Sequence, residues 1–153
     1  MTAPIRWERL PFDELTARTL YAVLALRADV FVVEQECAYM DTDGLDLGAD
    51  HLLGWRGDDL VAYARLLPSD YYKPGVTSVG RIAIARSDRR TGLGRALVQR
   101  AIDILRADAP AMPIRIAAQE YLMDFYASFG FVAFGDSYLE DGIVHRDMLL
   151  ASD

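Results

Sequence analysis

One segment of the 153-residue chain, from Val79 to Val98, constrains the fold more than any other part of the sequence. The apolar run Val79–Ala85 predicts a strand, and an arginine-rich turn with Gly92 and Gly94 follows it and leads into a predicted helix. Glycine allows the backbone to approach a ligand closely, and the first N–H groups of a helix lack internal partners and lie at the positive end of its dipole. The segment therefore predicts a site for a phosphate or pyrophosphate group.

Two common phosphate-binding motifs are missing from this segment. A P-loop requires Gly-x-x-x-x-Gly-Lys-Ser/Thr, and the only lysine of the chain is Lys73, in a predicted loop. A dinucleotide-binding fingerprint requires Gly-x-Gly-x-x-Gly, but Leu97 stands where a third glycine would follow Gly92 and Gly94. Both common classes of nucleotide-binding protein are therefore weak explanations of the segment.

The segment instead matches one half of a two-part family signature. Residues Arg89–Gly94 fit the pattern Gln/Arg-x-x-Gly-x-Gly/Ala, and residues Tyr126–Phe131 fit Tyr-x-x-x-Gly-Phe further along the chain. Together and in this order, the two motifs resemble the GCN5-related N-acetyltransferase (GNAT) superfamily. Other stretches resemble its ElaA-like branch, and with them the resemblance covers nearly the whole chain: Phe31–Gln35, Leu53–Trp55, Leu60–Arg65 and Glu140–His145.

Hydrophobic spacing and turn residues predict the other elements. A strand–helix–strand order in the middle of the chain predicts parallel pairing there, and hairpins at both ends, one of them turning at Gly57-Asp58, predict antiparallel pairing. The predicted helices are Leu15–Asp29, Phe31–Cys37, Gly92–Ala107 and Glu120–Phe129. The predicted strands are Ile5–Glu8, His51–Trp55, Asp59–Leu67, Val76–Ala85, Pro113–Ala118, Phe131–Phe134 and Val144–Leu150.

The resemblance implies a fold and an activity. The fold is α/β (α+β), with a GNAT-like mixed, mostly antiparallel sheet, a central parallel strand pair and helices on both faces. In this fold the two parallel strands splay apart, and the pantetheine arm of acetyl-CoA lies between them. A single such domain is expected over residues 1–153, because the 52% apolar content suffices for one core. The implied activity is direct transfer of the acetyl group of acetyl-CoA to a primary amine.

The donor site follows from the same resemblance. Backbone N–H groups between Arg90 and Arg95 are expected to hold the pyrophosphate, with the side chains of Arg89 and Arg90 adding positive charge. Backbone groups of the preceding strand are expected to hold the pantetheine and the carbonyl group, and Gln119 stands where many family members carry asparagine. The predicted donor-binding residues are Ile82, Ala83, Ile84, Arg89, Arg90, Thr91, Gly92, Leu93, Gly94, Arg95, Gln119 and Tyr126.

Tyr126 occupies the position of the family's general acid. A phenol has an ordinary pKa of about 10, so it is protonated at neutral pH and can donate its proton to a leaving thiolate. The alternative is that Tyr126 only packs on the buried side of a short helix, together with Phe125 and Phe129. The tyrosine motif favours the catalytic role.

The general base is less clearly marked. A primary ammonium group has a pKa near 10, so a base must remove its proton before attack. His145 follows a predicted turn, and histidine changes charge near neutral pH; Glu34 ends a predicted helix in a region resembling the family's acceptor side. For both, an ordinary structural role is the alternative. The candidates for the base are Glu34, His51, Glu140, Asp141 and His145, and we select Glu34 and His145.

The acidic segment from Asp41 to His51 admits three interpretations. An EF-hand loop would place glycine at its sixth position, but Gly44 falls at the fourth and Leu45 takes a ligand position, so we predict no metal. The carboxylates could instead attract a cationic acceptor. A polar loop with turn-forming aspartates is the simplest interpretation and is favoured.

Composition restricts the partners and the location. A net charge of −7 and a pI near 4.8 argue against nucleic acid and anionic membranes as partners, because both select basic surfaces. The single cysteine, Cys37, excludes an internal disulfide framework, and neither a signal peptide nor a membrane span is evident. The expected location is cytoplasmic, and the expected partners are acetyl-CoA and an amine acceptor. A homodimer is compatible with the sequence.

Two functional alternatives accompany the acetyltransferase hypothesis. The chain could be a catalytically silent acyl-CoA-binding sensor that keeps the donor site, although the intact Tyr126 argues against it. It could also be a related acyl transferase that makes a signalling lactone. An acyl-carrier partner would favour a broad basic surface, which the acidic composition does not support. The sequence does not define the amine acceptor.

Overall fold

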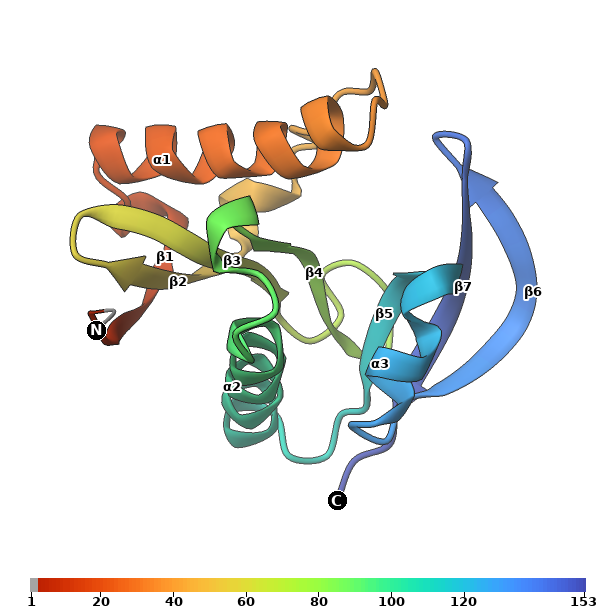
Figure 1. The fold of residues 1–153 in the computed structure, drawn as a ribbon. Helices are drawn as coiled ribbons and strands as arrows, with labels where there is room; N and C mark the ends of the chain where they lie inside the picture. Colours follow the sequence, from red (N-terminus) through yellow and green to blue (C-terminus); the bar gives the residue numbers. More distant parts are fainter. Residues whose placement is uncertain (1–2) are drawn as a thin grey trace.

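A single seven-stranded sheet organises the chain in the computed structural model, which describes residues 3–153 (Figure 1). The strands follow the order β1-β2-β3-β4-β5-β7-β6. Every neighbouring pair is antiparallel except β4 and β5, which are parallel. The strands are β1 (Ile5–Pro11), β2 (Asp50–Arg56), β3 (Asp59–Leu67), β4 (Thr77–Ile84), β5 (Ile114–Gln119), β6 (Val132–Glu140) and β7 (Ile143–Leu150). This confirms the predicted mixed, mostly antiparallel sheet.

The parallel pair separates soon after it forms. Strands β4 and β5 are registered only at Thr77 with Ile114 and at Ser78 with Arg115. The Ser78 hydroxyl donates a hydrogen bond of 2.7 Å to the Arg115 carbonyl at this point. Beyond it the two strands diverge toward their C-terminal ends, and the gap between their ribbons is visible in Figure 1. The splay implied by the family resemblance is therefore present.

A β-bulge in β4 lies beside the splay. Between the pairs Tyr63–Ala83 and Arg65–Gly80, strand β3 has one residue where β4 has the two residues Arg81 and Ile82. Arg81 adopts a φ of 49°, in the left-handed region that residues other than glycine rarely occupy. A bulge bends its strand and increases the local twist. It therefore turns the end of β4 away from the line of the sheet where β5 departs.

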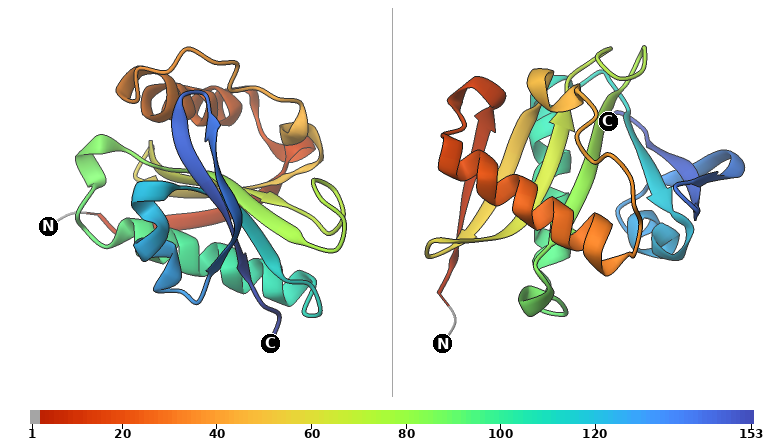
Figure 2. Two further views of the ribbon diagram at one scale, coloured as in Figure 1. Left: turned by 90° about the vertical axis from the view of Figure 1, so that its right-hand side faces the viewer. Right: turned by 90° about the horizontal axis from the view of Figure 1, so that it is seen from above.

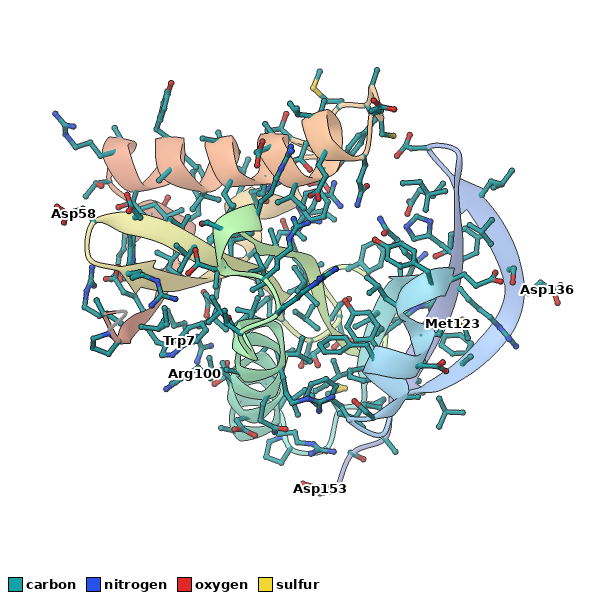
Figure 3. All side chains as sticks on the ribbon, viewed as in Figure 1. Trp7, Asp58, Arg100, Met123, Asp136 and Asp153 are labelled. Atoms are coloured by element: carbon teal, nitrogen blue, oxygen red, sulfur yellow. The ribbon has the colours of Figure 1, made fainter. Side chains whose placement is uncertain are left out.

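Helices cover both faces of the sheet (Figure 2), as predicted. Helix α1 (Ala17–Arg27) packs on one face around Val23, Leu53 and Tyr63. The long helix α2 (Leu93–Asp108) and the short helix α3 (Met123–Ala127) pack on the other. The second core includes Leu97 and the side chain of Tyr126. At its margin, Arg100 of α2 stacks over Trp7 of β1 at 4.9 Å, as their neighbouring labels in Figure 3 show.

The helical elements differ from the sequence prediction at several points. The predicted second helix Phe31–Cys37 is replaced by a π-helical segment, η2 (Ala28–Glu34), that continues α1 directly. The last predicted helix divides into a 3₁₀ turn, η5 (Glu120–Leu122), and α3. Further 3₁₀ turns are η1 (Phe12–Glu14), η3 (Leu45–Gly48) and η4 (Arg86–Asp88).

The last hairpin is longer than predicted. Strand β6 extends to Glu140 rather than ending at Phe134, because a register shift between Phe134 and Tyr138 lets its pairing with β7 resume. The resulting arm of β6 and β7 rises beside the splay (Figure 1). Among residues 3–153, no helix is both long and apolar enough to cross a membrane.

Candidate active site

An open helix N-terminus lies directly after the splayed end of β4. Gly92 precedes α2 with a φ of 85°, a left-handed conformation that favours glycine, and no side chain caps the helix. The Ala96 N–H makes the first bond back along the chain, to the Gly92 carbonyl at 3.1 Å. The N–H groups of Leu93, Gly94 and Arg95 come before it and lack helical partners. Apart from its two chain neighbours, no residue comes within 4 Å of a Cβ built on Gly92, so the side-chain position of this residue is open.

The turn before α2 is held by a buried carboxylate. Asp88 is 7% exposed and accepts hydrogen bonds from Arg56 of β2 at 2.6 and 2.9 Å. Burial alone would raise the pKa of Asp88, but hydrogen bonds from Ser87 and Arg56 outweigh it and lower the pKa. The Thr91 hydroxyl donates to the Asp88 carbonyl at 2.6 Å. The loop is therefore fixed before any ligand binds.

The backbone of β4 presents different groups to its two sides. Ala83 pairs with Tyr63 of β3, and the Ala85 N–H donates to the Val61 carbonyl at 2.8 Å. Because successive residues of a strand direct their backbone groups to opposite edges, the backbone of Ile84 faces the splay. Ile82 lies next to the bulge. Of the three predicted backbone contacts, Ala83 therefore faces β3 and Ile84 faces the opening.

The predicted base Glu34 and the predicted pyrophosphate ligand Arg89 bind each other. The Arg89 guanidinium donates to both carboxylate oxygens of Glu34, with Nη2 to Oε1 at 2.6 Å. It also donates to the Ile84 carbonyl from Nε at 3.2 Å and from Nη2 at 3.1 Å. The hydrogen bonds from Arg89 lower the pKa of Glu34. By contrast, Arg90 is exposed, has a φ of 64°, and has no side-chain partner among the described residues.

Arg95 joins the start of α2 to α3. Its guanidinium lies 4.7 Å from the centre of the Phe129 ring and 5.6 Å from that of Phe125. Its Nη2 donates to the Ser128 hydroxyl at 2.9 Å. The side chain of Arg95 therefore serves packing between helices, while its backbone N–H stays with the open helix end.

Tyr126 stands on the α2 side of the sheet, on α3. Its ring is 7% exposed and meets Phe125 and Phe131 edge to face, with ring centres 5.2 and 6.1 Å away. Burial, with a smaller contribution from Tyr121, raises the pKa of Tyr126 to about 12. Its hydroxyl has no hydrogen-bond partner among the described residues and is not one of the fully enclosed polar atoms. The phenol is therefore held protonated, with its donor unused.

His145 lies on β7, between β5 and β6. It is 8% exposed and pairs across the sheet with Gln119 of β5 and Tyr138 of β6, on whose ring it stacks. Its Nδ1 is 2.8 Å from the Ile143 carbonyl, which can only accept, so a neutral ring carries its proton on Nδ1. The lone pair of Nε2 is then free, with a carboxylate oxygen of Glu140 at 3.8 Å.

Residues on the α1 face approach one another across the opening. The Gln119 amide of β5 donates to the Gln35 side chain at 3.3 Å, just beyond η2. Directly opposed residues of antiparallel strands share a face, so His145 lies on the same face as Gln119. Figure 3 shows side chains projecting into the opening between β4 and β5 from both of its sides. The label Met123 marks α3, and Asp136 on β6 points away from the opening.

The acidic loop is built into the protein. Three arginines on three elements, Arg27, Arg65 and Arg81, bind its carboxylates with N–O distances from 2.7 to 3.3 Å. Three positive charges balance three negative ones, so the carboxylates of Asp41, Asp43 and Asp46 are already paired. This geometry favours the structural interpretation over attraction of a cationic acceptor. Within residues 3–153, no group of three or more His, Cys, Asp or Glu side chains could hold a metal ion.

The other base candidates lie in different settings. His51 is fully buried, with Nδ1 at 2.6 Å from the Tyr63 hydroxyl and Nε2 at 3.0 Å from the Asp46 carbonyl. Its distance from solvent argues against contact with an acceptor. Asp141 is exposed in the β6–β7 turn, and its carbonyl accepts from the Cys37 thiol at 3.2 Å.

Sequence reasoning did not select three residues that shape the site. Arg56 anchors the turn before α2, Gln35 crosses the opening, and the exposed Tyr121 lies close enough to Arg89 to influence its pKa. The phenol of Tyr121 stands on η5, between Gln119 and α3. The sequence placed Tyr121 in the same predicted helix as Tyr126, Glu120–Phe129, but gave it no role. The pairing of Arg56 with Asp88, 32 residues away, left no signal in the sequence.

The splayed parallel pair and the open helix start fit the arrangement that the family resemblance implies for acyltransferases that use acyl-CoA, and the comparisons agree. The model of the family described as "Acetyltransferase (GNAT) domain" matches residues 29–152, and the chain belongs to this family. It is similar to the protein ElaA of Escherichia coli K12, at 43% identity over 146 residues that cover 94% of this chain and 95% of that protein. The ElaA-like resemblance is confirmed.

Solved structures extend the comparison. The crystal structure of E. coli ElaA has a TM-score of 0.89 at 40% identity, covering 95% of this chain and 99% of that one. A Pseudomonas aeruginosa protein described as an acyl-CoA N-acyltransferase has a TM-score of 0.92 at 40% identity, covering 96% and 99%. The AHL synthase LasI has a TM-score of 0.71 at 15% identity, covering 97% and 90%, so it shares the fold alone.

Proposed function

We propose that the protein is an N-acetyltransferase that moves the acetyl group of acetyl-CoA directly to a primary amine. One observation carries this proposal: the splay between β4 and β5 opens at the uncapped start of α2, and Tyr126 offers an unused phenolic proton beside them. The absence of a side-chain cap leaves three backbone N–H groups for an anion, as a pyrophosphate requires. Nearby Arg90 adds an uncommitted positive charge.

The two sides of the opening divide the reaction between them. Acetyl-CoA supplies an activated thioester, and the N–H groups before Ala96 would hold its pyrophosphate while the edge of β4 holds its pantetheine. Tyr126 belongs to the core on the α2 side, whereas Gln119 and His145 face the α1 side. The donor therefore enters from one face of the sheet and the amine from the other, and the two meet within the splay.

Proton transfer is assigned to Tyr126 and His145. Nε2 of His145 would accept a proton from the ammonium group, and Glu140 would stabilise the resulting imidazolium. The free amine then forms an N–C bond to the acetyl carbon of acetyl-CoA, and the C–S bond of the thioester breaks. Tyr126 donates its proton to the thiolate of CoA. The excess proton on the amide nitrogen leaves to solvent, the Tyr126 phenolate regains a proton and the His145 imidazolium releases one, so both side chains return to their starting states. A cytoplasmic location remains a prediction.

Binding and turnover test this function separately. We expect acetyl-CoA, but not ATP or NAD, to bind in calorimetry, and a panel of primary amines to include one that releases thiol from it. Tyr126→Phe should keep the affinity for acetyl-CoA within about twofold and lower kcat by about 10²-fold. Binding without turnover of any amine would favour the silent sensor, and no binding would refute the acetyltransferase.

A further inference from the structure

We infer that Glu34 and Arg89 form a positioning pair that holds the acceptor side of the splay against the donor loop, and that Arg90 is the arginine left for the pyrophosphate. The inference rests on the proposed function and changes two roles that the sequence predicted. It removes Glu34 from the candidate bases and Arg89 from the primary pyrophosphate ligands. Four features of the described residues support it.

The first feature is the geometry of η2. A π-helix bonds residue i to residue i+5, so residues five apart come to one side, which an α-helix does not achieve. Asp29 and Glu34 are five apart in η2, and both reach arginines of the segment that leads into α2. Asp29 pairs with Arg86 at 3.0 Å, and Glu34 pairs with Arg89. The π-helical form therefore aligns two carboxylates with one loop.

The second feature is that four of the five N–H donors of the Arg89 guanidinium are already in use. Its Nη1 and Nη2 bind Glu34, while Nε and Nη2 bind the Ile84 carbonyl, the backbone group that faces the splay. One side chain thus connects η2, the end of β4 and the donor loop. A pyrophosphate could take the one remaining Nη1–H of Arg89, but a two-pronged contact would require some of these bonds to break. Arg90, next along the chain, has no such commitment among the described residues.

The third feature is a line of contacts that continues from Glu34 across the opening. After the pair with Arg89, Gln35 accepts a hydrogen bond from Gln119 of β5 at 3.3 Å. Cys37 then reaches the Asp141 carbonyl in the β6–β7 turn at 3.2 Å. Segment 34–37 therefore bridges the splay on the face where His145 lies. Its anchor at the donor loop is Glu34.

The fourth feature is the charge state of Glu34. The hydrogen bonds from Arg89 lower its pKa, so the carboxylate is ionised at neutral pH, and each of its oxygens accepts a bond from Arg89. Accepting a proton would disrupt the bonds that hold η2 in place. Such a carboxylate is a poor general base and a good anchor.

A double-mutant cycle on the reacting enzyme tests the pair. We expect Glu34→Gln and Arg89→Gln each to lower kcat/KM for the amine about tenfold through KM, and the double variant to be no worse than either one. The pH profile of kcat/KM should keep its shape in Glu34→Gln. If the loss of kcat/KM in the double variant equals the product of the two single losses, the two residues act independently and the inference is overturned. If the acidic limb of the pH profile of kcat/KM disappears in Glu34→Gln, Glu34 acts as the base and the inference is likewise overturned.

Two neighbouring residues provide matched controls. Glu36→Gln makes the same charge change two residues from Glu34, at an exposed side chain without an ion pair among the described residues, and should alter the amine KM less than twofold. Arg90→Gln should weaken acetyl-CoA binding about tenfold in calorimetry, and Arg89→Gln less than threefold. An equal effect of Glu36→Gln and Glu34→Gln, or a larger loss of affinity with Arg89→Gln than with Arg90→Gln, would refute the assignment.

Hydrogen exchange separates failure of this inference from failure of the proposed function. If the wild type acetylates no amine, the function fails, yet the pair can still be tested in the free protein. Glu34→Gln and Arg89→Gln should each accelerate amide exchange in residues 28–35 severalfold, and the double variant should add nothing further. Unchanged exchange in both single variants would overturn the pair.

Discussion

Gly92 combines a conformational requirement with a functional one. Its φ of 85° costs a residue with a side chain about 1 kcal/mol, and the space above it is open. We expect Gly92→Ala to lower the free energy of unfolding by about 1 kcal/mol in urea denaturation. It should also weaken acetyl-CoA binding at least tenfold, because the methyl group would enter the open space beside the N–H groups proposed to hold the pyrophosphate.

The hairpin residue Gly57 provides the control for this prediction. It has a φ of 61°, and a Cβ built there also meets no protein atom within 4 Å. Gly57→Ala should therefore cost similar stability while leaving the calorimetric affinity for acetyl-CoA intact. Equal affinities of the two variants would show that Gly92 lies outside the donor site.

His51 is a buried neutral histidine whose protonation opposes folding. Burial is the largest influence and lowers its pKa, and Arg27 and Arg65 also lower it, against the opposing effect of Asp46. Its Nε2–H donates to the Asp46 carbonyl, and its Nδ1 accepts from the Tyr63 hydroxyl. Below about pH 6.5 the unfolded chain therefore binds a proton that the folded chain resists.

The free energy of unfolding should consequently fall as pH decreases below about 6.5. The slope contributed by His51 is at most about 1.4 kcal/mol per pH unit. His51→Gln, which keeps an N–H donor for Asp46, should be less stable at pH 7 and should lack this contribution between pH 6.5 and 5. Urea titrations at a series of pH values measure it, and equal slopes in both proteins would contradict the prediction.

The bulge in β4 shows how an element depends on distant side chains. Arg81 holds a left-handed backbone while its side chain binds Asp41 at 2.8 Å and lies over the Tyr39 ring. Arg81→Ala and Arg81→Gly both lose these contacts, but only alanine retains the backbone strain. We expect the glycine variant to be more stable by about 1 kcal/mol in urea denaturation. Greater stability of the alanine variant would indicate that the bulge has relaxed.

Across the whole molecule, the arginine–aspartate network joins α1, β3, β4 and the loop from Asp41 to Asp46. Burial would raise the pKa of Asp46, but hydrogen bonds from Arg27 and Arg65 outweigh it and lower the pKa. Because the pKa of Asp46 is lower in the folded chain than in the unfolded chain, its ionised carboxylate stabilises the fold at pH values above the ordinary aspartate pKa, near 4. This stabilisation is lost as the pH falls through the pKa that Asp46 has in the folded chain. The free energy of unfolding should therefore fall more steeply below about pH 4.

Asp46→Asn tests the network as a unit. We expect a loss of about 3 kcal/mol at pH 7, because two arginine charges lose a buried partner. The variant should also lose less stability than the wild type between pH 4 and 2.5. Circular dichroism in urea at each pH measures both effects. A wild-type loss below pH 4 that persists in full in Asp46→Asn would assign acid unfolding to other groups.

Much of the architecture was predictable because it is encoded locally. Apolar alternation, the Gly57-Asp58 turn and the glycines before α2 act between near neighbours, so the strands β2 to β5 and the helix α2 were placed within a few residues. The π-helical form of η2 was not predictable. Its carboxylates pair with arginines far along the chain, such as Glu34 with Arg89, 55 residues away, and this spacing left no signal in the sequence.

The order of elements, the family and the places of Gly92 and Tyr126 could therefore be predicted from the amino-acid sequence, because they rest on local conformation and on spacing along the chain. Which charged side chains pair with each other became evident only in the folded protein. Folding paired Glu34 with Arg89, left Arg90 uncommitted, and enclosed the aspartates of the acidic loop with three arginines. The physical reason is that ion pairing depends on distance in space, and folding sets that distance between residues whose separation along the chain carries no signal.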